Sequence, residues 1–175
     1  MLILVGPSAS GKTEVANILI NKYHMKRMIT YTTRPIRVGE INHVSYHFVG
    51  EEEFLTRKAN NEFIEDAMYN GYHYGSNKKD AGSDKIVILE PNGVNSFYNK
   101  MGSDVTICFI TASESLRKER MIGRGDLPNQ IEKRISNDKE SFDIKNLQHI
   151  DKIFVNENKS LDELALEIFE YYNNN

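Results

Sequence analysis

The chain has 175 residues, enough for one sizeable hydrophobic core with small appended lobes. Charged residues make up 27% and hydrophobic residues 39%, values typical of a soluble domain. The 22 basic and 25 acidic side chains give a net charge of −3, which excludes the basic excess of a general nucleic-acid or membrane-surface binder. We expect neither a signal peptide nor a membrane span, because no apolar run is long enough. These features predict a cytoplasmic protein that binds no nucleic-acid polymer.

The first thirteen residues predict a short strand, a glycine-bounded loop and the start of a helix. The loop GPSASGKT, Gly6–Thr13, fits the pattern G-x-x-x-x-G-K-[ST] of a phosphate-binding loop. Gly6 and Gly11 allow backbone angles and close approaches that a Cβ would block. The loop N–H groups and the helix N-terminus then face an anion. Lys12 would reach the β- and γ-phosphates of a nucleotide, and the Thr13 hydroxyl would ligate Mg²⁺.

A Gly/Ser turn with a solvated lysine is the alternative interpretation of this loop. The context favours the phosphate loop, because the pattern lies between a strand and a helix.

After the first helix, short apolar runs alternate with helical patterns. We predict further strands at 26–30, 44–49, 85–89, 105–110 and 152–155. We predict helices at 51–61, 93–100, 113–122 and 129–142, and a last helix opened by the capping box Ser160–Glu163. Asn70-Gly71 between two aromatic-rich runs predicts a β-hairpin. Alternation of strands and helices predicts an α/β fold, a parallel sheet flanked by helices.

We divide the chain into three parts on this pattern. The core comprises residues 1–30, 81–112 and 146–175, a small β-rich lobe residues 31–80, and a helical lid residues 113–145. Cys108, the only cysteine, lies in an apolar strand and is interpreted as an inert core thiol.

Two groups of arginines are candidates for binding phosphate. Arg34 and Arg37 lie in a loop broken by proline and glycine, where they form either a solvated turn or a guanidinium pair for an anion. The second group lies in the lid and comprises Arg117, Lys118, Arg120, Arg124, Lys133 and Arg134. It is either a solvated helical face or a mobile flap, hinged at Gly123 and Gly125, that neutralises a transferring phosphoryl group.

Two acids are candidates for binding a base. Glu65 lies in an apolar strand, where a carboxylate is costly unless it is paired. It could accept hydrogen bonds from N1–H and the N2 amino group of guanine, or simply face outward. Glu90 follows a predicted parallel strand and lies either on the ligand side of the sheet or in a solvated loop. The histidines lack metal-ligand spacing, and we assign no role to His43, His47 and His73.

Over nearly the whole chain the sequence resembles the guanylate kinases. The resemblance is densest in Gly6–Thr13, Thr32-Thr33-Arg34-Pro35-x-Arg37-x-Gly39-Glu40, Tyr46-x-Phe48-Val49, Glu62-Phe63-Ile64-Glu65, Tyr74-Gly75-Ser76 and Arg120-x-x-x-Arg124-Gly125. It implies ATP and GMP as partners, Mg²⁺ bound with ATP, and a monomer or homodimer. The 31–80 lobe would then bind the nucleoside monophosphate.

The resemblance also implies roles for particular residues. Catalytic residues would be Lys12, Arg34, Arg120, Arg124 and Arg134. ATP would be bound by Gly6, Pro7, Ser8, Ala9, Ser10, Gly11, Lys12, Thr13 and Asn156, with Thr13 on the metal. The acceptor phosphate would be held by Arg34, Arg37, Tyr46 and Tyr74. Guanine would be surrounded by Thr30, Glu65, Ser76 and Glu90.

Three departures from the family pattern stand out. The family usually has glycine at Ala9, a change that is tolerable if this residue avoids positive φ. It usually has Asp-x-Asp-x-Gln-Gly where this chain has Ile88–Gly93, so that Ile88 replaces the first Asp and Glu90 the second. The connection from Ser76 to Lys85 is also short.

We therefore predict an ATP:GMP (or dGMP) phosphotransferase. Two alternatives stay open. One is a related P-loop kinase with another phosphorylated acceptor, such as a deoxynucleotide or a ribose bisphosphate. The other is a non-catalytic guanylate-kinase-like binding module, although such modules typically lack a working phosphate loop.

Overall fold

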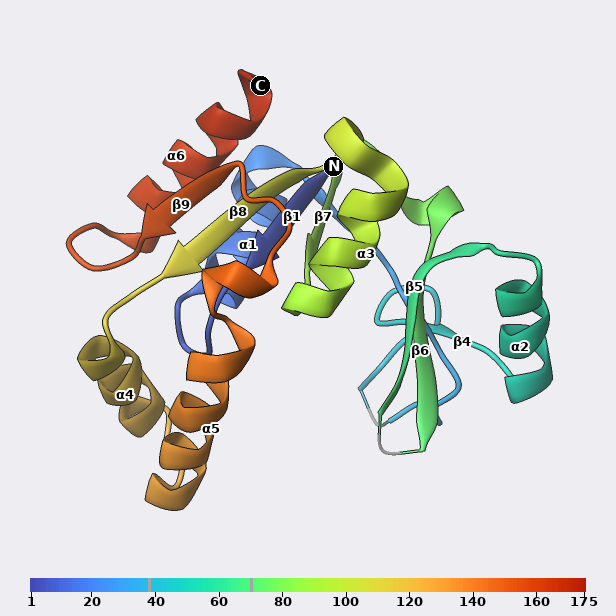
Figure 1. The fold of residues 1–175 in the computed structure, drawn as a ribbon, viewed down its shortest axis with the longest axis horizontal. Coiled ribbons are helices and arrows are strands. Elements are labelled where there is room, and N and C mark those ends of the chain that lie inside the picture. Colours follow the sequence, from blue (N-terminus) through green and yellow to red (C-terminus); the bar gives the residue numbers. More distant parts are fainter. Residues whose placement is uncertain (38, 70) are drawn as a thin grey trace.

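A five-stranded parallel sheet forms the centre of the molecule (Figure 1). The computed structural model describes residues 1–175 except 38 and 70. The strand order is β2-β7-β1-β8-β9. The bounds are β1 Leu2–Val5, β2 Lys26–Arg27, β7 Lys85–Ile88, β8 Thr106–Thr111 and β9 Lys152–Val155. All four residues of β1 are fully buried, because this strand lies in the middle of the sheet and both of its faces are covered.

Helices cover the two faces of the sheet. On one face α1, Lys12–Tyr23, and α6, Leu161–Asn173, pack on the side chains of Leu2 and Leu4. On the other face α3, Pro91–Met101, packs on Ile3 and Val5 (Figure 1). The predicted capping box of α6 is present, since Ser160 and Glu163 bond each other's backbone N–H. The predicted α/β fold is confirmed.

A second, smaller sheet lies beside the core, with strand order β4-β3-β6-β5. Its strands are β3 Tyr31–Thr32, β4 His47–Phe48, β5 Phe63–Tyr69 and β6 Tyr72–Asn77. The helix α2, Glu51–Ala59, packs on it through Phe54, which joins Tyr31 and Phe63 in a small aromatic core. The predicted hairpin strands are observed and pair antiparallel, whereas Asn70 of the predicted turn lies outside the described residues.

Two helices, α4 Glu114–Gly123 and α5 Pro128–Ser141, extend from the far side of the core (Figure 1). Met121, Ile131 and Ile135 form their shared apolar contact. Short 3₁₀ turns connect other elements: η1 Lys78–Asp80, η2 Gly102–Asp104 and η3 Ile144–Asn146.

Several predicted boundaries were wrong. The strands expected at 26–30 and 44–49 are only two residues long. The second is short because residues 41–46 turn back on themselves through bonds such as that from Ser45 N–H to Ile41 O. Tyr31 and Thr32, expected in a loop, pair with both β4 and β6. The helix expected at 93 begins at Pro91, because proline is well suited to the first helical position. Among the described residues, no helix is long and apolar enough to cross a membrane.

Candidate active site

The loop Gly6–Thr13 connects the carboxyl end of β1 to the N-terminus of α1. Gly6 has φ +147°, and a Cβ there would lie 2.0 Å from the carbonyl oxygen of Ile110. Gly11 has φ +102°, and a Cβ would lie 2.3 Å from Asn156 Nδ2. Both distances are far inside van der Waals contact. The backbone of the loop therefore needs glycine at both positions, as the sequence predicts.

Ala9 adopts φ +58°, in the left-handed region. The condition under which the sequence makes alanine tolerable here, a negative φ, is therefore not met. The conformation costs a residue with a Cβ about 1–2 kcal/mol. Ala9 also packs against the apolar cluster formed by Met121, Ile131 and Ile135 of the lid helices, which offsets part of that cost.

Lys12 is folded back on its own loop. Its ammonium donates to the carbonyl oxygens of Gly6, at 2.6 Å, and Pro7, at 2.8 Å. Burial lowers the pKa of Lys12, while the charges of Glu90 and Asp138 partly counteract this effect. The side chain thus lies among loop carbonyls, where it is ready to exchange them for a stronger anionic partner.

A cavity of about 340 Å³ opens above the loop and the first turn of α1. It is lined by Ala9, Gly11, Lys12, Thr13, Glu14, Arg120, Arg124, Asn156 and Leu161. Arg120 donates to the carbonyl oxygens of Ala9, at 3.2 Å, and Asn156, at 2.9 Å. Asn156 is almost fully buried and donates through Nδ2 to Ser10 O at 2.8 Å. Predicted ATP-binding residues from two parts of the chain therefore meet at one cavity with the predicted catalytic residues Arg120 and Arg124.

The other two arginines that were predicted to be catalytic in the lid, Arg124 and Arg134, both contact a single acid. Arg124 Nη2 lies 2.6 Å and Arg134 Nη1 3.3 Å from Asp126 Oδ2. Both arginines are about half exposed. Arg124 lines the cavity above the loop. Arg134 is not among the described residues that line this cavity.

A second cavity, of about 640 Å³, lies between the core and the smaller sheet. Its wall includes Thr30, Tyr46, Glu65, Tyr74 and Glu90 of the predicted acceptor residues, together with Asn92, Gly93 and Ser96 of α3. The two cavities share no lining residue.

Glu65 is turned toward this second cavity by an irregularity in the strand pairing next to Ile64. Its carboxylate accepts a 2.8 Å hydrogen bond from the hydroxyl of Ser76, the residue opposite it on β6. Oε2 lies 3.7 Å from the position that a Cβ on Gly93 would take. Burial raises the pKa of Glu65, and the charge of Asp66 adds to this effect. A half-buried carboxylate with free lone pairs thus faces this second cavity, which we call the acceptor cavity after the predicted acceptor residues in its wall.

Arg34 is buried and already paired. Its Nη2 donates to Glu40 Oε1 at 2.7 Å, and its guanidinium lies 5.6 Å from the ring centroids of both Tyr46 and Phe48. Arg37 is exposed, and Glu40 accepts from its backbone N–H at 2.8 Å. Glu40 therefore fixes the loop that carries both arginines.

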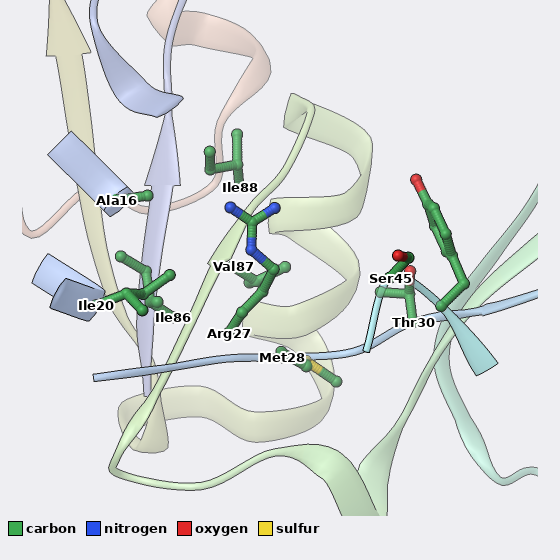
Figure 2. A pocket seen from close by; sticks show the side chains of 10 residues that line it. Ala16, Ile20, Arg27, Met28, Thr30, Ser45, Ile86, Val87 and Ile88 are labelled. Carbon is green, nitrogen blue, oxygen red and sulfur yellow. The ribbon is translucent and has the colours of Figure 1, made fainter. Parts of the chain in front are cut away.

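Ile88, which replaces the family's first Asp, ends β7 and lines two cavities. One is the acceptor cavity. The other is a smaller cavity of about 160 Å³, whose wall carries Ile20 and Ile86 on the core side and Thr30 and Ser45 on the other (Figure 2). Glu90 precedes α3, and its pKa is raised by desolvation despite the attraction of Lys12. Because Ile88 stands where the family has an acid, the wall of the acceptor cavity is apolar between Glu90 and Thr30.

Asp138 is a site residue to which the sequence assigned no role, and Arg117, predicted only as a member of the basic lid group, is its partner. Both are buried and both contact Ser8 of the phosphate loop. A signal was present, because Asp138 continues the apolar i, i+4, i+7 stripe of Ile131 and Ile135, and Arg117 lies four residues before buried Met121. A charge on a buried helical stripe indicates a specific partner.

The histidines of the smaller sheet form contacts but no recognisable site. His43 and His47 approach to 2.7 Å between their Nδ1 atoms, and His47 Nε2 lies 3.7 Å from Asp80. Within the described residues, no group of three or more His, Cys, Asp or Glu is arranged to hold a metal ion.

A parallel sheet with the motif of a phosphate-binding loop at its carboxyl edge, arginines of α4 beside that loop and a second, separate cavity are together typical of a P-loop kinase. The family model described as guanylate kinase matches residues 1–172. The chain belongs to the guanylate kinase family.

Individual relatives agree with this assignment. The guanylate kinase of Anaplasma phagocytophilum is 33% identical over 90% of this chain and 79% of its own length. That of Sulfurimonas denitrificans is 34% identical over 90% of this chain and 80% of its own. The crystal structure of guanylate kinase from Anaplasma phagocytophilum superposes with a TM-score of 0.69, at 26% identity, over 99% of this chain and 84% of that one. A gluconokinase from Sinorhizobium meliloti, at 14% identity and a TM-score of 0.54, shares the fold alone.

Proposed function

We propose that the chain transfers the γ-phosphoryl group of ATP to GMP or dGMP and releases ADP and GDP or dGDP. The observation that carries this proposal is the carboxylate of Glu65, which faces a cavity separate from the phosphate loop. One cavity suits a nucleoside triphosphate, and the other suits a purine monophosphate. Catalysis consists of positioning and electrostatic stabilisation, with no covalent intermediate.

The donor nucleotide binds above the phosphate loop. The N–H groups of Gly11, Lys12 and Thr13 at the N-terminus of α1 face its phosphates. The Lys12 ammonium leaves the carbonyls of Gly6 and Pro7 and moves onto the β- and γ-phosphate oxygens. Arg120 and Arg124 supply further positive charge from the wall of the same cavity.

Mg²⁺ is the metal that these residues fit. Thr13 is exposed in the donor cavity and offers one hard oxygen. Mg²⁺ usually takes one or two protein ligands and completes its shell with phosphate oxygens and water, so the absence of an acidic cage among the described residues suits an ion that arrives with ATP. When bound, the ion neutralises charge on the β- and γ-phosphates.

The acceptor phosphate binds at the loop of Arg34 and Arg37. Arg34 is held in place by Glu40 and by the rings of Tyr46 and Phe48. Its guanidinium would therefore lose little conformational entropy on binding a phosphate. Tyr46 and Tyr74, whose ring centroids are 6.2 Å apart, place two phenol groups at the same end of the cavity.

The base binds deeper, against Glu65. Guanine presents N1–H and its N2 amino group side by side, and one carboxylate can accept both hydrogen bonds. Adenine presents an acceptor at N1 and would leave the half-buried charge unpaired. Thr30 and Glu90 also line the acceptor cavity, and Ser76 lies behind Glu65 and bonds its carboxylate. We further propose the division into a core (1–30, 81–112, 146–175), an acceptor lobe (31–80) and a lid (113–145), which the separate apolar clusters support.

The proposal is tested by ADP release, measured with a coupled assay, for GMP, dGMP, AMP, CMP and UMP. We expect GMP to be preferred over AMP by roughly 10²–10³ in kcat/KM. In Glu65→Gln the amide NH₂ meets the guanine donors, so GMP turnover should fall more than about tenfold while ATP affinity is unchanged.

Glu62→Gln is the matched control. Glu62 lies near the start of the same strand but bonds Arg57 and Asn77 and does not line the acceptor cavity. It should leave the GMP/AMP ratio unchanged. Equal use of GMP and AMP by the unmodified chain would overturn the guanine assignment and favour a P-loop kinase with another acceptor.

A further inference from the structure

Arg117 of α4 and Asp138 of α5 form a buried ion pair at the base of the lid. Arg117 Nη1 lies 2.7 Å from Asp138 Oδ2, and both side chains are 7% exposed. Within the described residues, Arg34 is the only other buried charged residue. Removing two charges from water costs several kcal/mol per ion, so a pair at this position calls for a specific explanation.

Both partners contact the same residue of the phosphate loop. Ser8 donates its backbone N–H to Asp138 Oδ2 at 2.9 Å and its hydroxyl to Asp138 Oδ1 at 3.1 Å. Arg117 Nη1 donates to the Ser8 carbonyl oxygen at 3.3 Å. All three polar groups of Ser8 are therefore held by the lid helices.

The next residue of the loop adds an apolar contact at the same place. Ala9 packs against Met121, Ile131 and Ile135, which lie on the same helical stripes as Arg117 and Asp138. The tip of the phosphate loop is thus inserted between the bases of α4 and α5. Polar and apolar contacts together fix the lid to the loop.

Stability alone does not account for the pair. Arg117 Nε is buried without a hydrogen-bond partner, and an unsatisfied buried donor costs about 1–3 kcal/mol. Replacing a buried ion pair by apolar side chains of similar volume is often neutral or stabilising. A purely structural contact between two helices would be better made by leucine and methionine.

The pair is placed close to the arginines of the proposed reaction. Arg117 lies three residues before Arg120 on α4, and Asp138 lies four residues after Arg134 on α5, so each pair of neighbours shares a helical face. Any shift at the base of either helix is therefore transmitted to these arginines.

We propose that Arg117 and Asp138 are positioning residues. They anchor the lid to Ser8 of the phosphate loop and thereby set where the lid arginines lie relative to the phosphates. This inference rests on the proposed phosphoryl transfer. The pair itself touches neither substrate.

The first test replaces the pair by the double variant Arg117→Met/Asp138→Leu. We expect its melting temperature to be equal to or higher than that of the unmodified chain. Because a displacement of about 1 Å in a reacting group can cost about 10²-fold in rate, we expect kcat with GMP to fall about 10- to 100-fold while KM for GMP is little changed. Retention of normal kcat in a folded double variant would overturn the proposal.

Single variants and a matched control sharpen the result. Arg117→Met and Asp138→Leu should each cost about as much in kcat as the double variant, because the pair acts as a unit. Glu114 of α4 reaches α5 through Lys139, at 3.0 Å, and also pairs with Lys118 of its own helix, at 2.6 Å, but its side chain is 37% exposed. Glu114→Gln should leave kcat unchanged. An equal loss in this control would mean that any contact between the helices suffices, and would contradict the special role of the buried pair.

A measurement without chemistry separates this inference from the proposed function. Spin labels are placed at Ile122→Cys on α4 and Leu166→Cys on α6, both exposed, while the native Cys108 is fully buried. The label–label distance distribution should be narrow in the unmodified chain and broader in the double variant, whichever acceptor the enzyme uses. Identical distributions would overturn the anchor even if GMP turnover is confirmed. A broader distance distribution in the double variant, together with no GMP turnover by the unmodified chain, would support the anchor and contradict only the proposed acceptor.

Discussion

Lys12 would exchange its hydrogen-bond partners when the proposed complex with ATP forms. Its ammonium now satisfies two loop carbonyls. In the Lys12→Ala variant these oxygens would face the donor cavity and water, so we expect the melting temperature to shift by only a few degrees. Removing one preorganised charge from a phosphoryl-transfer site should lower kcat by at least about 10²-fold. Steady-state kinetics and a melting curve on the same sample check both effects. Near-normal turnover would contradict the proposed role of the loop.

Glu65 links pH to both activity and stability. Its pKa is raised by burial, so the folded state holds the proton more tightly than the unfolded state. The ionised carboxylate therefore opposes folding at pH values above both pKa values, and this penalty disappears as the pH falls through the folded pKa. GMP binding needs the ionised form. We expect kcat/KM for GMP to decline on acidification at a higher pH than an ordinary glutamate would give.

The variant Glu65→Gln tests this link, because its amide oxygen can still accept from Ser76. It should melt at a higher temperature than the unmodified chain at neutral pH, with a difference that shrinks as the pH is lowered. It should also lose the acidic limb of the pH–rate profile. A lower melting temperature at neutral pH would show that the carboxylate stabilises the fold instead.

The phosphate loop is the element in which sequence and backbone agree most closely. A Cβ at Gly6 would lie 2.0 Å from the carbonyl oxygen of Ile110, a backbone atom of β8 that cannot move without disrupting the sheet. We expect Gly6→Ala to destabilise the fold by about 3 kcal/mol or more, in the range of severe core substitutions. Gly123→Ala is the control, because a Cβ added there would meet no neighbouring atom within 4 Å. Denaturant unfolding should separate the two variants by at least about 2 kcal/mol.

Local patterns in the sequence predicted most elements, and long-range contacts account for the errors. The strand 152–155 and the cap at Ser160 depend on short patterns and were predicted correctly. β3 consists of only Tyr31 and Thr32, and it exists because β6 and β4, both distant in sequence, pair with it. The orientation of Glu65 depends on an irregular pairing at Ile64, which alternation alone does not reveal.

The distinction between local patterns and long-range contacts also explains which site residues could be predicted from the sequence. The phosphate loop follows from a contiguous pattern, whereas the contact of Asp138 with Ser8 spans 130 residues. Only the docking of α5 on the loop brings the two together. The pairing of Arg34 with Glu40 is local, six residues apart, and could have been inferred from the loop sequence. Positive φ at Ala9 was indicated only by the glycine that the family usually has there, and the packing of Ala9 on Met121, Ile131 and Ile135 was not predicted.

At the scale of the whole molecule, the two proposed substrate cavities are separate. They share no lining residue, yet a phosphoryl group passes directly between substrates only when the two lie in line and water is excluded. Because the proposed anchor holds the base of the lid at Ser8, we expect most of the closing motion to come from the 31–80 lobe. Two glycines with positive φ lie at the expected joints of this motion. Gly39, at φ +87°, lies in the loop of Arg34 and Arg37, and Gly125, at φ +85°, lies beside Arg124.

Small-angle X-ray scattering should detect this closure. A compact chain of 175 residues has a radius of gyration of about 16 Å, and we expect the free protein to exceed this value. Addition of ADP and GMP together, which cannot react, should reduce the radius by on the order of 1 Å toward the compact value, because the arginines of the lid and the 31–80 lobe gain anionic partners. ADP alone or GMP alone should give only part of the change. A radius that is the same with and without both nucleotides would mean that the transfer proceeds without closure, and the lid arginines would then need another route to the phosphates.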